Sequence, residues 1–443
     1  MNQEKAAFLQ DSVPKTVIKN AVPALIAMVM VMVYNLADTF FLGLTKNDLQ
    51  VAAVSIASPV FMIFMSLGTL FGVGGTSVIS RAIGAGDEAR AKKASSFCTW
   101  CCVGIGAVLM GTLWLTADSI ARMLGASKDT MDYTLSYLRI TIGCGVFSML
   151  SNCFSNLIRA EGKPMVAMTG TVVGNLLNLI LDPVMILWLD WGITGAAIAT
   201  VIGNVVGAGY YFIYFFRKQS KLSISPKCFS GKEKIAKDVI LVGLSASLAN
   251  LLVSLSSMVA NRQMAEYGDM FVAGYGVTAK VLMVISLMGI GLGTGVQPLF
   301  GYCYGAKERK RLTQSIRFSV CFGLGVCILL SVVCGIFAGP IVKVFLTNES
   351  AYTSGIHFTR ILMTSAWLIG AFVVIQNALQ AMGAAIPALL ASIFRQGLIF
   401  VPVMFLLKGM LGMDGILWAQ PVADVLSLGM IIVMLLYKLK KTK

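Results

Sequence analysis

Charged residues, histidine and nucleotide-binding motifs are scarce or missing in this sequence. Only 12% of its 443 residues are Asp, Glu, Lys or Arg, against roughly 25% in a typical soluble protein. A single histidine, His357, excludes a metal site made of several histidines. The chain has no Gly-x-x-x-x-Gly-Lys-Ser/Thr phosphate loop, so direct use of ATP is not expected. Segments of about ten alternating residues, typical of membrane β-barrels, are also missing.

The ten cysteines do not form a pattern typical of metal or redox sites. Cys98 and Cys101 have Cys-x-x-Cys spacing, but no second pair and no histidine is near them in the sequence. Free cysteine often behaves as a small buried hydrophobic residue. We therefore expect no metal and no cofactor beyond a coupling ion.

Apolar residues dominate the composition, at 57%, and the mean hydropathy is +0.82. Apolar runs repeatedly exceed the ~20 residues needed to span a bilayer. We expect an all-α polytopic membrane protein, which excludes a soluble enzyme. The polar stretch 1–15 lacks the features of a cleaved signal peptide, so the first span is expected to act as an uncleaved insertion signal. The twelve expected spans are 14–43, 51–80, 94–117, 131–158, 164–190, 193–217, 235–262, 271–302, 314–338, 353–381, 387–410 and 413–438.

Lys and Arg are concentrated in alternate loops. With the N-terminus inside, most of them lie in inside segments, whose bases include Lys5, Lys218 and Lys443, whereas Lys46 is an outside base. The positive-inside rule therefore predicts that both termini are cytoplasmic, in the inner (cytoplasmic) membrane. The net charge of +15 is accounted for by these loops. Nucleic-acid binding is not expected, because no soluble basic domain is present.

The two halves of the chain repeat each other. Residues 51–90 align with 272–311 without a gap, and Gly192–Gly195 align with Gly412–Gly415. Six spans in each half give a parallel repeat, a build that recurs in secondary transporters. We expect an N-terminal six-helix bundle (1–220), a cytoplasmic linker (221–234) and a C-terminal six-helix bundle (235–443).

Two acids lie within the apolar spans of the first half. Asn178 and Asp182 are four residues apart, as are Tyr34 and Asp38, so each pair shares one face of a helix. Carboxylates at membrane depth are costly and usually functional. Oxygen donors suit Na⁺, and the same carboxylates could carry a proton. Further polar candidates in neighbouring spans are Tyr137, Asn152, Asn156, Asn175, Thr200 and Asn204.

Structural alternatives remain open for these residues. Asp38 could be solvated at the outer interface, and Asp182 could satisfy the backbone of a helix broken at Pro183. An Asn or Thr in a membrane helix often makes only an interhelical hydrogen bond.

The second half differs at the corresponding positions. Val259 falls opposite Asp38 and Val401 opposite Asp182. Arg395 and Asp424 are expected to pair within the C-terminal bundle, as a structural contact or a gate, because buried charges normally find partners. Lys280 is expected to face a cavity or to snorkel.

Several motifs carry a resemblance to a known family. They are Tyr34–Gly43, Arg159–Pro164, Asn178–Pro183 and Gln297–Lys307. With them the chain resembles the multidrug and toxic compound extrusion (MATE) transporters over essentially its whole length, and most of all the MepA-like bacterial branch. The resemblance implies a 6+6 helical fold around a V-shaped central cavity and export of organic cations against a Na⁺ or H⁺ gradient. It also implies ion coupling at the matching positions Asp38, Asn178, Asp182 and Thr200, with Tyr34 and Tyr137 nearby.

The resulting hypothesis is a secondary antiporter that exports cationic amphiphilic drugs by alternating access. Its expected partners are small organic cations and membrane lipids, and it is expected to be a monomer. A flippase for lipid-linked sugars is the alternative, although it would favour a strongly basic cavity. A channel, a membrane enzyme and a scaffold are further classes; the enzyme would need a nucleophile and base, which the polar set does not provide.

Overall fold

The computed structural model describes residues 11–45, 47–217, 220–232, 234–346 and 348–441. Over these ranges the chain is helical and has no strand, which confirms the predicted fold class. The predictions that involve Lys5, Lys46, Lys218 and Lys443, the end residues 1–10 and 442–443 of the two halves, and position 233 of the linker lie outside the described residues.

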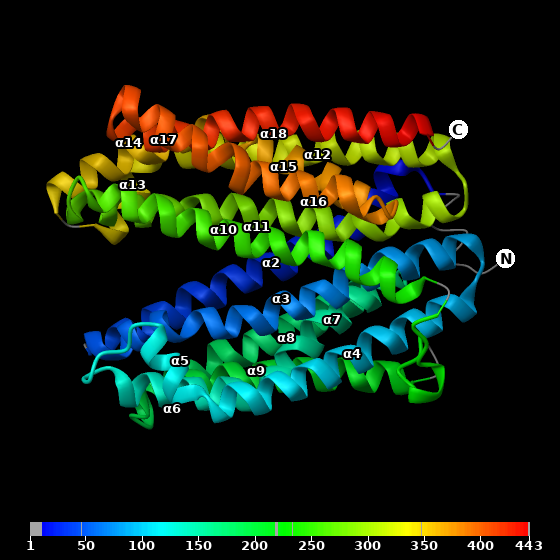
Figure 1. The fold of residues 1–443 in the computed structure, drawn as a ribbon, viewed down its shortest axis with the longest axis horizontal. Helices are drawn as coiled ribbons and strands as arrows, with labels where there is room; N and C mark the ends of the chain where they lie inside the picture. The colour runs from blue at the N-terminus through cyan, green and yellow to red at the C-terminus, as the bar shows by residue number, and fades with distance from the viewer. Residues whose placement is uncertain (1–10, 46, 218–219, 233, 347, 442–443) are drawn as a thin grey trace. The chain divides into compact units, whose positions relative to one another are not determined.

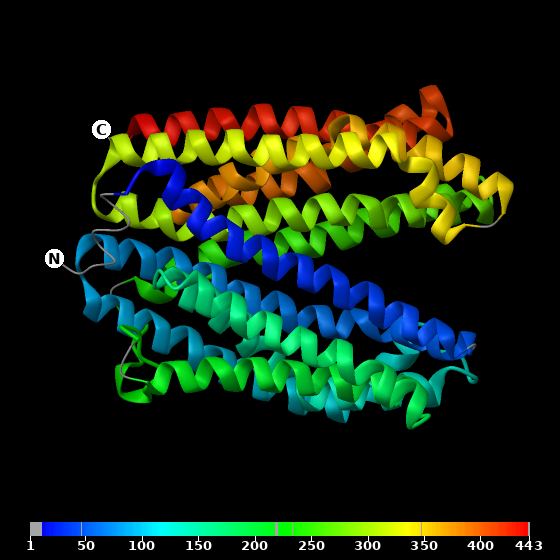
Figure 2. The ribbon, with the colours of Figure 1, turned by 180° about the vertical axis from the view of Figure 1, so that it is seen from behind.

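The described helices fall into two compact units. The N-terminal unit is Ile26–Gly243 and the C-terminal unit is 1–25 with Leu244–Lys443. Helices of the first are α3 (Asp48–Ala85), α4 (Glu88–Leu115), α5 (Ala117–Met123), α6 (Met131–Gly143), α7 (Gly145–Ala160), α8 (Pro164–Pro183), π-helical η1 (Val184–Trp188), α9 (Gly192–Phe216) and η2 (Pro226–Cys228). Helices of the second are α11 (Asp269–Gly305), α12 (Arg309–Ile336), α13 (Ala338–Phe345), α14 (Glu349–Ala366), α15 (Leu368–Ala381), α16 (Ala385–Ile393), π-helical η3 (Phe394–Ile399), α17 (Phe400–Leu411) and α18 (Met413–Lys441). Within each unit the long helices run side by side (Figures 1 and 2).

The unit boundaries fall inside two long helices, α2 (Val13–Leu44) and α10 (Ile235–Ala265). The beginning of α2 groups with the C-terminal unit, and the beginning of α10 groups with the N-terminal unit. These groupings differ from the predicted halves at 1–25 and 235–243, and the halves as folding domains stay a prediction.

Ten of the described helices are long and apolar enough to cross a membrane, or twelve if each bent pair counts as one span. The bent pairs are α6–α7, with a 51° bend, and α14–α15, with a 43° bend. They coincide with the predicted spans 131–158 and 353–381. Each half therefore breaks its fourth span at a corresponding place, which fits the repeat.

Close backbone contact holds α8 against α9. A Cβ added to Gly174 would lie 2.7 Å from the carbonyl oxygen of Gly203, and the reverse is also true. Two turns earlier on α8, the Ala167 carbonyl oxygen accepts a hydrogen bond from Tyr211 Oη of α9 at 2.6 Å. Small residues at such a contact let two membrane helices approach closely. This approach brings the polar residues further along α8 within reach of α9.

The described part of the linker is bound to the N-terminal unit. Ser96 donates to the Ser225 carbonyl oxygen at 2.7 Å, and Trp100 Nε1 donates to the Ile224 carbonyl oxygen at 3.1 Å. The buried carboxylate of Glu161 accepts hydrogen bonds from Ser220 Oγ at 3.0 Å and from the backbone N–H of Lys221. The linker thus follows the surface of α4 instead of crossing free solvent.

Candidate functional site

Asn178 and Asp182 lie on the α8 face that contacts α9. Both side chains are buried, and Asp182 has 0% exposure. Asn178 Nδ2 lies 3.3 Å from Asp182 Oδ1 and 3.4 Å from Thr200 Oγ1 of α9. The helical spacing of four residues explains the first contact, and the close α8–α9 packing explains the second. The structure therefore brings together three of the four predicted ion-coupling residues.

The fourth, Asp38, is close enough to Asp182 for the two carboxylates to interact electrostatically. Asp38 lies on α2 and is half-buried. The hydroxyls of Tyr34, one turn earlier on α2, and of buried Tyr137 on α6 interact electrostatically with both acids. Three helices besides α9 thus contribute to one polar cluster, which we call the acid site: Tyr34, Asp38, Tyr137, Asn178, Asp182 and Thr200.

Several oxygens of the acid site are buried without a hydrogen-bond partner among the described residues. They are Oδ1 of Asp38, Oδ1 of Asn178 and Oδ2 of Asp182. Leaving a buried acceptor unsatisfied costs about 1–3 kcal/mol. A hard monovalent cation prefers such oxygens, and a carboxyl proton would turn one acceptor into a donor. These oxygen atoms could therefore either coordinate Na⁺ or bind H⁺.

Two of the other predicted residues lie beside the acid site. Asn204 donates from Nδ2 to the Thr200 carbonyl oxygen at 3.0 Å, which is a bond within α9. Asn175 precedes Asn178 by one turn, and its buried Nδ2 has no partner in the described part of the chain. An amide N–H cannot coordinate a cation, so only the oxygen of Asn175 fits that role.

Asn152 and Asn156 make contacts elsewhere. Asn152 Nδ2 donates to Thr69 Oγ1 of α3 at 3.2 Å. Asn156 donates to Asn152 Oδ1 at 3.1 Å and accepts from Arg159 Nη1 at 3.4 Å. The bond to Thr69 links α7 to α3, and the other two lie within α7. They correspond to the structural alternative for a membrane asparagine.

Sequence reasoning did not single out a second polar group, in the C-terminal unit. Buried Gln376, Gln380 and Gln297 contact one another or serines, with Gln376 Nε2 2.6 Å from Ser392 Oγ and Gln380 Nε2 3.1 Å from Ser245 Oγ. The sequence feature that could have indicated this group is the presence of glutamines inside apolar spans. Their mutual bonds account for them as interhelical contacts.

Arg395 and Asp424 form an ion pair in the C-terminal unit. Arg395 Nε lies 2.9 Å from Asp424 Oδ1, and the Asp424 side chain is only 3% exposed. The Lys280 ammonium lies 5.5 Å from the centre of the Phe345 ring, a cation–π contact. Val259 and Val401, which fall opposite the two acids in the repeat, pack against a hydrophobic cluster.

Metal-binding groups of three or more His, Cys, Asp or Glu residues are absent from the described residues. Cys98 and Cys101 are free thiols; Cys98 is buried and Cys101 is half-buried.

Comparison with known proteins identifies the family of the chain. The MatE family model matches residues 23–184 and 246–406. The multidrug export protein MepA of Staphylococcus aureus (strain MRSA252) is 30% identical over 426 residues, which cover 96% of this chain and 94% of the relative. MepA of Staphylococcus haemolyticus (strain JCSC1435) is 30% identical over 420 residues, covering 94% and 92%.

Solved structures share the fold. A crystal structure of MATE in complex with MaL6 has a TM-score of 0.94 at 24% identity, covering 100% of this chain and 99% of the other. An outward-facing multidrug resistance MATE family transporter of the MOP superfamily also reaches 0.94, at 23% identity and the same coverage. The chain therefore belongs to the MATE family of multi-pass membrane transporters.

Proposed function

We propose that this protein is a secondary antiporter that exports cationic amphiphilic drugs and other organic cations, coupled to entry of Na⁺ or H⁺ at the acid site. The observation that carries this proposal is the pair Asp38 and Asp182, two interacting carboxylates with unpaired buried oxygens. The relatives named as multidrug export proteins support the drug-export part.

The acid site suggests how coupling works. Without a bound cation or proton, Asp182 carries an uncompensated charge in a buried position, which is costly. A conformation that admits a compensating ion is therefore favoured by ion binding, since a ligand shifts an equilibrium by its differential affinity for two states. Asn178 orients the site by linking Asp182 to Thr200. Alternating access would follow if ion-bound and ion-free forms favour opposite openings.

The proposed membrane orientation follows from the distribution of Lys and Arg among the loops. Both termini face the cytoplasm in the cell membrane, where anionic lipids attract Lys and Arg. The transporter works as a monomer, with membrane lipids and small organic cations as its partners and no cofactor beyond the coupling ion.

The test is drug efflux in everted vesicles, with a Na⁺ or a proton gradient imposed separately. Asp182→Asn should abolish ion-driven export, while Asp118→Asn, at an exposed position in α5, should leave export dependent on the ion. Unchanged gradient-driven export by Asp182→Asn would exclude coupling at the acid site. If neither gradient drives export by the unmodified protein, the proposed antiport activity is excluded.

The flippase alternative has less support. A lipid pyrophosphate needs several bases in the membrane interior. Of the two intramembrane bases found in the sequence, Arg395 is neutralised by Asp424 at 2.9 Å.

A further inference from the structure

We propose that the C-terminal unit contains a second cation site, centred on Asp424, that is filled by the chain's own Arg395 guanidinium. Only the N-terminal unit would then exchange its cation with the surroundings. The inference deepens the proposed function, and it rests on that function only for its consequence for coupling.

The repeat places Gln420 opposite a residue of the acid site and Asp424 opposite a residue beside it. Aligning Gly192 with Gly412 puts Asn204 opposite Asp424 and Thr200 opposite Gln420. The structure supports this register, because Gly192 and Gly412 both have a positive φ, 49° and 62°; Gly192 is the first residue of α9, and Gly412 directly precedes α18. A positive φ favours glycine, so a glycine at both positions fits the alignment.

The preceding span contributes to both sites. In the N-terminal unit it is α8 with η1, which carries Asn178 and Asp182. In the C-terminal unit it is α16, η3 and α17, and η3 carries Arg395. π-helical turns occur often at functional sites. In the first half this span thus supplies the carboxylate of Asp182, whereas the corresponding span of the second half supplies the guanidinium of Arg395.

Asp424 is fully coordinated where the acid site is not. Its Oδ1 accepts from Arg395 Nε and from Gln420 Nε2, both at 2.9 Å, and its Oδ2 accepts from Ser365 Oγ at 3.0 Å. The guanidinium carbon lies 4.7 Å from the centre of the Phe372 ring. A carboxylate, polar donors and an aromatic face are together what a monovalent organic cation requires.

The comparison of the two units gives the mechanistic consequence. Asp182 keeps an unpaired buried oxygen among the described residues, so its compensating cation must come from outside. The cation that pairs with Asp424 is a side chain of the same protein. Its effective concentration at the site is therefore one that a free ion cannot match. The second site therefore cannot load and unload, and coupling falls to the first.

The test uses purified full-length protein and its melting temperature in detergent. Arg395→Ala removes the resident cation and should lower the melting temperature, and millimolar guanidinium should restore a large part of the loss. Urea at the same concentration is the control for non-ionic effects. The unmodified protein should not be stabilised by guanidinium. Failure of guanidinium, methylguanidinium and Na⁺ alike to stabilise Arg395→Ala would overturn the proposed site.

Two double variants identify Asp424 as the binding group. Arg395→Ala with Asp424→Asn should lose the stabilisation by guanidinium, whereas persisting stabilisation would contradict binding at Asp424. Arg395→Gln with Asp424→Asn removes both charges and should keep the ion-to-drug ratio of transport. A changed ratio would make Asp424 a coupling acid and overturn the inference. The melting experiment needs no transport, so it can succeed even if Asp182→Asn disproves coupling at the acid site.

Discussion

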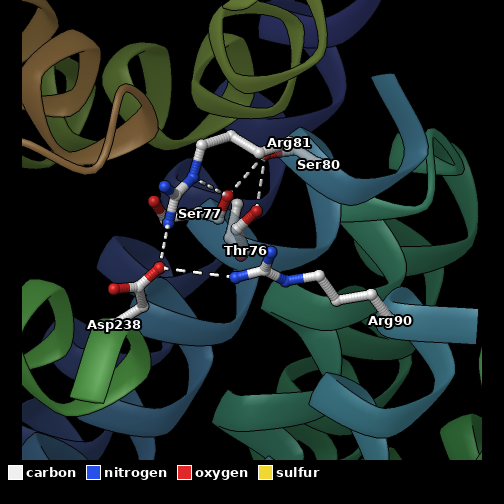
Figure 3. A network of polar contacts seen from close by, with 6 residues as sticks. All are labelled: Thr76, Ser77, Ser80, Arg81, Arg90 and Asp238. Carbon is white, nitrogen blue, oxygen red and sulfur yellow. Dashed lines mark hydrogen bonds and ion pairs between the residues drawn. The ribbon is translucent and has the colours of Figure 1, made fainter. Parts of the chain in front are cut away.

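Asp238, at the beginning of α10, lies 3.4 Å from Arg81, near the end of α3, measured from Oδ2 to Nη2 (Figure 3). The same carboxylate oxygen lies 3.7 Å from Nη2 of Arg90 on α4. Backbone packing reinforces this contact, since a Cβ on Gly74 would lie 2.1 Å from the Val239 carbonyl oxygen. The ion pairs and the close backbone packing thus hold the start of α10 against α3 and α4.

A double-mutant cycle on Arg81 and Asp238 should show that this contact is energetically coupled. Both side chains are partly exposed, at 22% and 31%, so we expect a coupling energy of only about 0.2–1 kcal/mol. Asp238→Lys should cost more than Asp238→Asn, because it places a third positive charge beside two arginines. Chemical unfolding of the four cycle variants measures the coupling. Additive effects of the two single substitutions would contradict the contact.

The repeat relates this contact to one in the C-terminal unit. Arg90 aligns with Arg311, and Arg311 Nη2 donates to the Asp11 carbonyl oxygen at 2.6 Å, just before α2 begins. Each arginine therefore holds the beginning of the first helix of the other sequence half. The sequence alignment contained this equivalence, but not the partners of the two arginines.

Gly174→Ala should separate α8 from α9. The new methyl group would meet the Gly203 carbonyl oxygen at 2.7 Å, and overpacking of this kind costs typically about 1–3 kcal/mol. We expect a lower melting temperature and weaker ion-driven export, because Asn178 and Thr200 would move apart.

Gly209→Ala is the matched control for that substitution. Gly209 also lies in α9, but a Cβ there would meet nothing within 4 Å. Alanine is favoured over glycine in a helix by up to about 1 kcal/mol, so the control should be neutral or stabilising. Equal losses in both variants would show that the close α8–α9 contact is not responsible.

The acid site and Asn152 should respond differently to the loss of a polar side chain. Thr200→Val removes the acceptor 3.4 Å from Asn178 Nδ2, and loss of such a bond costs about 0.5–1.5 kcal/mol. We expect the apparent affinity for the coupling ion to fall by roughly two- to tenfold, with Thr200→Ser retaining it.

Asn152→Ala provides the contrast. Its bonds run to α3 at 3.2 Å and 3.4 Å, so stability should fall while the ion dependence of export stays the same. Vesicle efflux at graded ion concentrations separates the two effects. A shift in ion affinity for Asn152→Ala would place that residue in the site after all.

The sequence was sufficient for features that depend on local spacing. Apolar length predicted the spans, and the four-residue interval predicted the Asn178–Asp182 contact. It could not assign Asn152 and Asn156, because residues on different faces of one apolar helix look alike until the neighbouring helices are placed. The same reason explains why the first residues of α2 and α10 were assigned to their own halves: their apolar surface carries no sign of which bundle it meets. The ordered linker depends on buried Glu161, which the spacing of charges in the loops did not reveal.

Glu161→Ala should release the linker from the N-terminal unit. The carboxylate accepts from Tyr214 Oη at 3.0 Å, from Ser220 Oγ and from the Lys221 backbone, and alanine would leave these donors without that acceptor. Trypsin should then cleave purified protein faster after Lys221 or Lys227, because proteolysis follows the population of the locally opened segment. Glu161→Gln keeps an acceptor and should give an intermediate rate, while Asp118→Ala, at an exposed site in α5, should leave the rate unchanged. An unchanged cleavage rate in Glu161→Ala would mean that the serine and tryptophan contacts of α4 hold the linker without Glu161.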